Sequence, residues 1–193
     1  MQAITYPARP INGGPLESAA PLLGPWAYEP KLNGWRALIH VPTGTMFNRQ
    51  GQELSIAGEF GPALAQLRAS PFEWLDAEAL ERRHGLGRGT LWVFDVVTPA
   101  IPYRQRKGQL TAHFNCGEPA RPPAPDEVWL VPELCASRAE ALLWYRRLQQ
   151  LNQAWGGEFF EGLVAKRLDS LYPIQLTSPE KEFSGWTKFR WRW

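Results

Sequence analysis

The stretch WAYEPKLNGWRALIHV, residues 26–41, contains the pattern on which the expected fold depends. Apolar residues alternate with other residues, most clearly in WRALIHV, and this alternation is typical of a strand with one buried face. The two halves meet at a turn that contains Asn33 and Gly34, and such residues favour a reversal of the chain. We therefore expect two consecutive antiparallel strands, with Lys31 beside the turn between them.

The same pattern recurs outward from this stretch, interrupted by a few helical segments. In GEFGPALAQLR, residues 58–68, the apolar residues fall on one helical face, and Pro62 lies near the helix start, where a missing N–H is harmless. A turn is expected at residues 82–89. Further strands are expected at residues 44–49, 72–80, 90–97, 128–131, 161–168 and 185–191.

The clearest helix begins at Ser137, which has Glu140 three residues later, as a capping box requires. It is expected to end at the Gly156-Gly157 pair. A shorter helix is expected at residues 103–114. The apolar face of the longer helix comprises Leu142, Leu143, Tyr145, Leu148 and Leu151.

The order of these elements predicts the fold class. Strand-rich blocks with a few helices, and without a regular βαβ alternation, indicate an α+β domain built on antiparallel sheets. The first 25 residues are rich in Pro, Gly and small residues, and are expected to be an irregular lead-in packed on the domain. The remaining residues, 26–193, are expected to form that single domain.

The composition excludes several classes of protein. The 193 residues are 44% apolar and carry a net charge of +2, and no apolar run approaches the ~18 residues of a membrane span. The N-terminus lacks a signal-peptide pattern and there are only two cysteines, so we expect a cytoplasmic protein with no membrane partner. The charge is too small to indicate a strongly basic nucleic-acid binder. Most of the ten tryptophans are expected to pack in the core and at its edges rather than to stack on bases.

Six short motifs occur in a fixed order along the chain. Each alone is explained by ordinary structure, for example by a solvated lysine or an edge carboxylate. Their order resembles that of the covalent nucleotidyltransferases, which are the ATP-dependent DNA ligases, RNA ligases and mRNA capping enzymes, and the resemblance to DNA ligases is closest. The motifs are EPKLNGWR (29–36), FNRQG (47–51), LDAE (75–78), VFDV (93–96), EGLVAKR (161–167) and WTKFR (186–190).

The resemblance implies a covalent mechanism that starts at Lys31. This lysine would attack the α-phosphate of ATP, expel pyrophosphate and form lysyl-AMP, with Mg²⁺ or Mn²⁺ as the cofactor. An attacking amine must be unprotonated, so it needs neighbouring cations or a site without water. Lys188 and Arg190 alternate along one strand, and both would therefore face the site and neutralise the phosphate.

The resemblance also implies contacts with the nucleotide and the metal. Phe94 is equally well explained as a core residue, because VFDV alternates. Gly34 is expected to allow the backbone to approach a ligand closely. The implied contacts are Glu29 with the adenine amino group, Arg36 and Arg49 with the phosphate or ribose side, Glu78 with the ribose hydroxyls, Phe94 with the base, Lys166 near the site, and Glu161 with the divalent metal.

The sequence departs from the DNA ligase pattern in three places. Asn33 stands where DNA ligases usually have Asp and RNA ligases often have Asn. Arg190 stands where DNA ligases usually have Lys, and it keeps the charge. The sequence stops three residues after Arg190, so we expect no OB-fold domain here, and a protein partner is the expected source of its function.

Several functions remain open at this point. The first is a minimal ATP-dependent polynucleotide ligase, or its adenylyltransferase core, acting in DNA repair or replication on nicked or end-bearing nucleic acid, with DNA favoured over RNA. An RNA ligase is the main alternative, and a capping enzyme that uses GTP ranks below it. A different class is a binding module that holds nucleotide or a nicked end and needs a partner for ligation.

Overall fold

The computed structural model describes residues 8–80, 86–121, 124, 127–174 and 182–191. Residues 81–85 lie outside this part of the chain, so most of the turn expected at residues 82–89 is not described. Within the described residues, no helix combines the length and the apolar character needed to cross a membrane.

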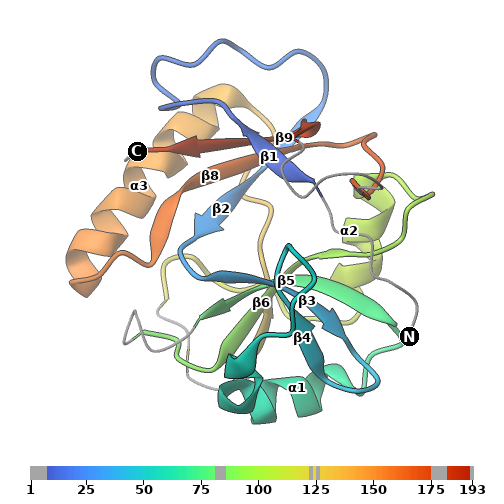
Figure 1. Ribbon diagram of the computed structural model, residues 1–193. Coiled ribbons are helices and arrows are strands. Elements are labelled where there is room, and N and C mark those ends of the chain that lie inside the picture. Colours follow the sequence, from blue (N-terminus) through green and yellow to red (C-terminus); the bar gives the residue numbers. More distant parts are fainter. Residues whose placement is uncertain (1–7, 81–85, 122–123, 125–126, 175–181, 192–193) are drawn as a thin grey trace.

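Two sheets form the framework, and Figure 1 shows the smaller sheet above the larger one. The four-stranded sheet has the order β1-β9-β8-β2, and the five-stranded sheet has the order β4-β3-β5-β6-β7. The strands are β1 (Arg9–Asn12), β2 (Trp26–Leu32), β3 (Trp35–His40), β4 (Thr45–Phe47), β5 (Trp74–Leu80), β6 (Thr90–Val96), β7 (Val128–Leu130), β8 (Phe160–Arg167) and β9 (Glu182–Arg190).

The strands β2 and β3 belong to different sheets, and the expectation that they pair with each other is wrong. β2 pairs with β8, whereas β3 pairs with β4 and β5. Asn33, in the turn between them, is hydrogen-bonded to the segment that precedes β8 and not to β3. Its backbone N–H donates to Phe159 O at 3.0 Å, and its side-chain amide donates to Glu158 O at 2.9 Å. The turn therefore carries the chain from one sheet to the other and places Lys31 where they meet.

The α+β class is confirmed, with one parallel pair at an edge of each sheet. β1 runs parallel to β9, and β7 runs parallel to β6; all other pairs are antiparallel. β1 lies within the first 25 residues, which we expected to be irregular. Its Pro10 lacks an N–H, but an edge strand tolerates this because one side of its backbone needs no sheet partner.

The helices begin and end close to their expected positions. Residues 55–60, Ser55–Phe60, form a 3-10 helix, η1, and the regular helix α1 begins only at Gly61, one residue before Pro62, and ends at Leu67. The helix α2 spans Tyr103–Thr111 and so ends three residues earlier than expected.

The helix α3, Arg138–Trp155, has the predicted ends. Ser137 Oγ accepts a hydrogen bond from Glu140 N at 3.2 Å, as in a capping box, and donates to Glu140 Oε2 at 2.7 Å, so both predicted residues cap the helix. Gly156 closes the helix with a φ of 67°, a left-handed conformation that favours glycine.

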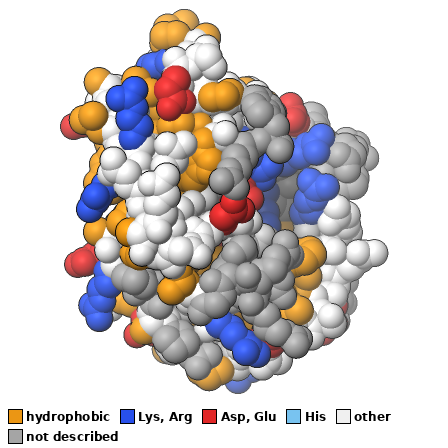
Figure 2. Space-filling model, turned by 90° about the vertical axis from the view of Figure 1, so that its left-hand side faces the viewer, with side chains coloured by type: hydrophobic (Ala, Val, Ile, Leu, Met, Phe, Trp, Pro, Cys, Tyr) orange, Lys and Arg blue, Asp and Glu red, His pale blue; other side chains and the backbone are white. Residues whose placement is uncertain are grey.

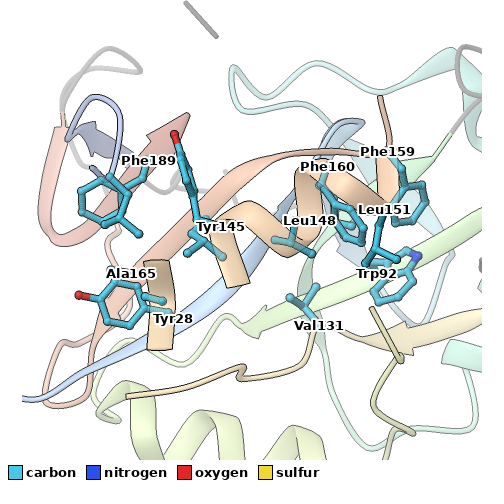
Figure 3. Close-up of a cluster of buried hydrophobic side chains, with 14 of the residues drawn as sticks. Tyr28, Trp92, Val131, Tyr145, Leu148, Leu151, Phe159, Phe160, Ala165 and Phe189 are labelled. Carbon is cyan, nitrogen blue, oxygen red and sulfur yellow. The ribbon is translucent and has the colours of Figure 1, made fainter. Parts of the chain in front are cut away.

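The first hydrophobic core lies between α3 and the four-stranded sheet. Figure 3 shows Leu148 and Leu151 of α3 near Phe160 and Phe159, with Tyr145 of the same helix toward Phe189. Leu143, expected on this buried face, is instead 67% exposed, because the buried stripe runs through Ala141, Tyr145 and Leu148, and a residue two positions from Ala141 points to the opposite side of the helix.

The second core lies under the five-stranded sheet, on the side covered by η1 and α1 (Figure 1). Phe60, Leu64 and Leu67 pack there against Leu75 and Ile39. Most of the described tryptophans contribute to packing, as expected, and Trp92 and Trp186 are almost completely buried. The first core also includes Leu80 and Trp92 of the five-stranded sheet, so it joins the two sheets, whereas the second core belongs to the five-stranded sheet.

Candidate active site

A cleft of about 420 Å³ opens between the two sheets. Figure 2 shows one face of the molecule on which Lys and Arg side chains gather at a hollow. The structure brings all ten predicted site residues to the cleft, although they come from six strands and loops on both sheets. They are Glu29, Lys31, Arg36, Arg49, Glu78, Phe94, Glu161, Lys166, Lys188 and Arg190.

Lys31 lies in an ion pair at the centre of this arrangement. Its Nζ is 2.6 Å from Glu161 Oε2, and the same oxygen is 3.0 Å from Arg190 Nη2. The three residues come from adjacent strands, because Lys31 of β2 lies opposite Gly162 of β8, which lies opposite Arg190 of β9. Glu161 lies where this pairing is irregular, since the next pair is Leu32 with Phe160. The irregularity brings the predicted metal ligand to the predicted nucleophile and a predicted catalytic cation.

Gly162 makes this register possible. Its φ is +148°, and a Cβ at this position would lie 1.8 Å from Phe189 O in the neighbouring strand. Only glycine lets β8 and β9 approach closely at this point. The glycine after Glu161 thus has a backbone role, whereas the carboxylate before it has a role in the cleft.

Substitution of Gly162 by alanine is expected to lower the free energy of unfolding by about 2 kcal/mol or more, because a backbone carbonyl has to move. The labelling by ATP that the motif resemblance implies should fall with it, since the register of Glu161 and Arg190 shifts. Thermal unfolding and labelling of the protein would measure both effects. Gly58→Ala is the matched control, because a Cβ there meets nothing within 4 Å. An unchanged unfolding midpoint for Gly162→Ala would contradict the prediction.

Glu78 faces the cleft from the five-stranded sheet. Its Oε1 accepts a hydrogen bond from Gly34 N at 2.9 Å, which connects the β2–β3 turn to β5. Burial raises the pKa of Glu78, although Lys31 and the Gly34 N–H act in the opposite direction. We had expected Gly34 to allow a ligand to approach the backbone. The structure gives a different reason for this glycine: a Cβ on Gly34 would lie 2.6 Å from Ala79 O of the neighbouring strand β5.

Arg36 is fixed by groups from both sheets. It makes two hydrogen bonds to the buried Asp76, of 3.0 and 2.6 Å, and Tyr172 donates to the same carboxylate at 2.7 Å. Its guanidinium also lies over the rings of Phe94 and Trp186, 5.5 and 5.4 Å from their centroids. Asp76 therefore positions Arg36 at the wall of the cleft.

Glu29 lies at the other end of the cleft in a buried ionic network. Its carboxylate accepts from Tyr103 Oη at 2.6 Å and from Lys107 Nζ, and its Oε2 lies 2.7 Å from Lys166 Nζ. Burial opposes its ionisation, but the two lysines outweigh this and lower the pKa of Glu29. The Glu29 carboxylate, for which the resemblance implied a contact with adenine, therefore already has three partners in the protein, namely Tyr103, Lys107 and Lys166.

Lys166 and Phe94 complete this end. Lys166 Nζ donates to Phe94 O at 2.7 Å and lies 4.8 Å from the centroid of the Phe94 ring. Phe94 is half-buried; it lines the cleft and also packs against the first core. Both explanations that the sequence left open for this side chain therefore agree with its position.

Sequence reasoning missed several residues that line the cleft or support it. Arg9 comes from the segment read as irregular, and Trp186 precedes the basic pair of β9. Tyr103 and Lys107 lie on α2, whose buried side carries charge and so gave no apolar stripe. The signal that could have found Lys107 is a charged pair, Arg106-Lys107, in a helix that follows a buried strand.

The acidic groups of the cleft fit a divalent cation only together with a ligand. The described residues contain no group of three His, Cys, Asp or Glu side chains placed to hold a metal ion. Mg²⁺ at nucleotide sites is commonly held by one or two carboxylates and by substrate phosphates. Glu161 offers one such carboxylate beside Lys31, so this donor set fits a cation that is completed by phosphate oxygens.

Comparison with known proteins supports the fold. No protein-family model matches the chain, and no curated protein sequence matches it. Among solved structures, the chain is similar to the ligase domain of LigD from M. tuberculosis (19% identity, TM-score 0.61, covering 96% of this chain and 59% of that one). It is also similar to mycobacterial DNA ligase D complexed with ATP (18%, 0.62, 97% and 60%) and to Chlorella virus DNA ligase-adenylate (18%, 0.59, 97% and 69%).

These similarities define the class of fold. The chain has the fold of the nucleotidyltransferase domain of ATP-dependent DNA ligases, as the motifs had indicated. It spans about three fifths of the length of the LigD ligase domain.

Proposed function

We propose that this chain is the adenylyltransferase core of an ATP-dependent polynucleotide ligase, with DNA as the favoured substrate. The observation that carries the proposal is the position of Lys31, which lies in a cleft between two sheets with Glu161 at 2.6 Å and Arg190 on the same carboxylate. In this proposal Lys31 attacks the α-phosphorus of ATP, a P–N bond forms, and the bond to pyrophosphate breaks. The AMP then passes to a 5′-phosphate, and a 3′-hydroxyl displaces it.

In this proposal, Lys31, Lys188 and Arg190 have different roles in the first step. Lys31 has to leave the ion pair with Glu161 and lose a proton before its nitrogen can attack. Lys188 and Arg190 provide positive charge where the phosphate becomes more negative. Burial lowers the pKa of Lys188, and the charges of Arg190, Arg9 and Lys31 lower it further.

A divalent cation, when bound, supplies charge neutralisation at the phosphates. Glu161 is the residue proposed to hold it, together with phosphate oxygens of the ligand. Competition for Glu161 would also free Lys31 from its ion pair, so the same carboxylate serves both the resting and the reacting arrangement.

Incubation with α-labelled ATP and Mg²⁺ tests the proposal directly. Label that stays on the protein after denaturation, and that is released by pyrophosphate, is the expected result. A nicked duplex with a 5′-phosphate should then be sealed, and a parallel RNA substrate measures the preference. If the protein binds ATP or nicked DNA but never acquires label, it is a binding module and not a transferase.

ATP is expected to react roughly 10- to 100-fold faster than GTP in kcat/KM, which corresponds to one hydrogen bond to a charged group. A carboxylate has about four acceptor positions, and the network leaves one on Glu29 for the adenine amino group. Guanine presents a carbonyl oxygen there instead. The ratio of labelling by the two nucleotides is the measurement, and it does not depend on the fraction of folded protein. Equal labelling would contradict the assigned role of Glu29.

The identity of residue 33 does not favour an RNA substrate. Asn33 donates its side-chain amide to Glu158 O, and an aspartate has no N–H to donate in this position. The Asn therefore has a local structural cause in the turn between the sheets. The preference for DNA in this proposal rests on the motifs around Glu161 and on the similarity of fold.

A further inference from the structure

We propose that Lys107 of α2 is a positioning residue that decides which purine base the cleft accepts, because it holds Glu29 as an ionised hydrogen-bond acceptor. This inference rests on the proposed function, since it names the source of base selectivity in the same site. None of the six motifs contains Lys107, and it is not among the described residues that line the cleft. Lys107 would therefore act on the ligand only through Glu29.

The two oxygens of Glu29 have different partners. Oε1 accepts hydrogen bonds from Tyr103 Oη at 2.6 Å and from Lys107 Nζ, whereas Oε2 lies 2.7 Å from Lys166 Nζ. A carboxylate has about two acceptor positions on each oxygen, so Oε1 is filled and Oε2 keeps one position. Lys166 lines the cleft, whereas Tyr103 and Lys107 hold the carboxylate from α2. The acceptor position that remains is therefore on the oxygen beside the ligand space.

The amine of Lys107 has a fixed position behind Glu29. Its Nζ also donates to Val131 O, and Val131 N donates to Val93 O of β6 at 2.8 Å. The preceding residue, Arg106, makes two hydrogen bonds to a buried carboxylate of the same strand, of 2.7 and 3.0 Å. Lys107 is only 7% exposed, so water screens its charge weakly and the charge acts strongly on Glu29.

The charge of Lys107 matters because Glu29 is almost completely buried. Burial opposes the ionisation of Glu29, but Lys107 and Lys166 together outweigh it and lower the pKa. Lys166 also lies 3.9 Å from Asp95 Oδ2, and Glu133, in the segment after β7, adds a further negative charge nearby. Without Lys107, the pKa of Glu29 should rise, and the carboxyl group would take up a proton more readily.

The protonation state of Glu29 determines which base it can bind. An ionised carboxylate only accepts hydrogen bonds, so it matches the amino group at C6 of adenine. A protonated carboxyl group can donate its O–H, so it matches the carbonyl oxygen that guanine and hypoxanthine carry at C6. A buried acceptor that faces another acceptor is left unpaired, which weakens binding. Lys107 therefore excludes the carbonyl-bearing bases by keeping Glu29 ionised.

Calorimetric titrations without divalent cation, so that no transfer occurs, test this inference. They compare ATP with inosine triphosphate, whose base has the C6 carbonyl of guanine but lacks its amino group. Lys107→Gln removes the charge and keeps two N–H donors for Glu29 and Val131. Lys107→Met removes the donors as well, and Lys107→Arg keeps the charge. Arg104→Gln is the matched control, because it removes a positive charge from the exposed face of the same helix.

The ratio of the two dissociation constants is the measurement. In Lys107→Gln the preference for ATP is expected to fall about tenfold or more, which corresponds to one hydrogen bond to a charged group. Lys107→Met should lose at least as much, so the test does not depend on one variant folding. Lys107→Arg should retain most of the preference, and Arg104→Gln all of it.

The pH dependence of the same ratio is a second readout. In Lys107→Gln the preference for ATP should rise with pH, because Glu29 ionises as protons are removed, whereas the wild type should change less. The inference is overturned if Lys107→Gln weakens both nucleotides by the same factor, or if neither changes. Formation of lysyl-AMP by the wild type is recorded separately, so failure of the proposed function is distinguished from failure of this role of Lys107.

Discussion

Lys31→Ala protein is expected to acquire no covalent label from α-labelled ATP, while unfolding at nearly the same temperature as the wild type. No other side chain lies at the position of the Lys31 amine, and a methyl group has no electron pair with which to attack phosphorus. The fold should persist, because Glu161 keeps its ion pair with Arg190 at 3.0 Å when Lys31 is removed. Gel autoradiography and mass spectrometry of the denatured protein measure the loss.

Lys31→Arg is the matched variant for this experiment. The guanidinium keeps the positive charge next to Glu161 but does not lose a proton in proteins, so it cannot act as a nucleophile. We expect it to bind ATP and to remain unlabelled. Label on either variant would show that the nucleophile is a different residue.

Asp95→Ala is expected to lower the free energy of unfolding by about 3–5 kcal/mol, which for a chain of this size lowers the midpoint by roughly 6–20 °C. Asp95 and Arg106 are both completely buried and form two hydrogen bonds of 2.7 and 3.0 Å. Removing the carboxylate leaves a buried guanidinium without its counter-charge. Thermal and denaturant unfolding of purified protein provide the measurement.

A second Arg–Asp pair supplies the control on the same chain. Arg167 and Asp169 form hydrogen bonds of 2.6 and 3.0 Å, nearly the same geometry, but on the surface. Asp169→Ala should therefore change stability little, because water replaces the lost partner. If Asp95→Ala yields no folded protein, Asp95→Asn, whose amide oxygen can still accept one of the two hydrogen bonds from Arg106, is expected to show a smaller loss. Equal effects at the buried and exposed sites would refute the argument from burial.

The location of the site could be predicted because each motif falls on or beside a strand. Lys31, Glu161 and Arg190 lie on the adjacent strands β2, β8 and β9, and they meet where the pairing of β2 with β8 shifts after Lys31. The α3 helix could be predicted from its capping box. These are local patterns, and a local pattern predicts the structure when no contact with residues distant in the sequence overrides it.

The path of the chain between the sheets could not be predicted in the same way. Alternation of apolar residues is the same whether β2 pairs with β3 or with β8, so the pattern does not select the partner. β1 was missed because Pro10 and Gly13 read as loop, while its pairing depends on β9, far away in sequence. Arg106 and Lys107 of α2 were missed because charged residues normally face water, and here buried carboxylates hold them inside.

The position of the cleft between two sheets has a consequence for amide hydrogen exchange. The second apolar cluster belongs to the five-stranded sheet, whereas the first joins the four-stranded sheet to Leu80 and Trp92 of the other, so parts of the free protein can open with different free energies. In the proposed function, a nucleotide would contact Glu29 on one sheet and Glu78 on the other. Its binding free energy would add to the cost of separating the sheets, and amides of β2 and β5 are expected to become slower to exchange as one unit.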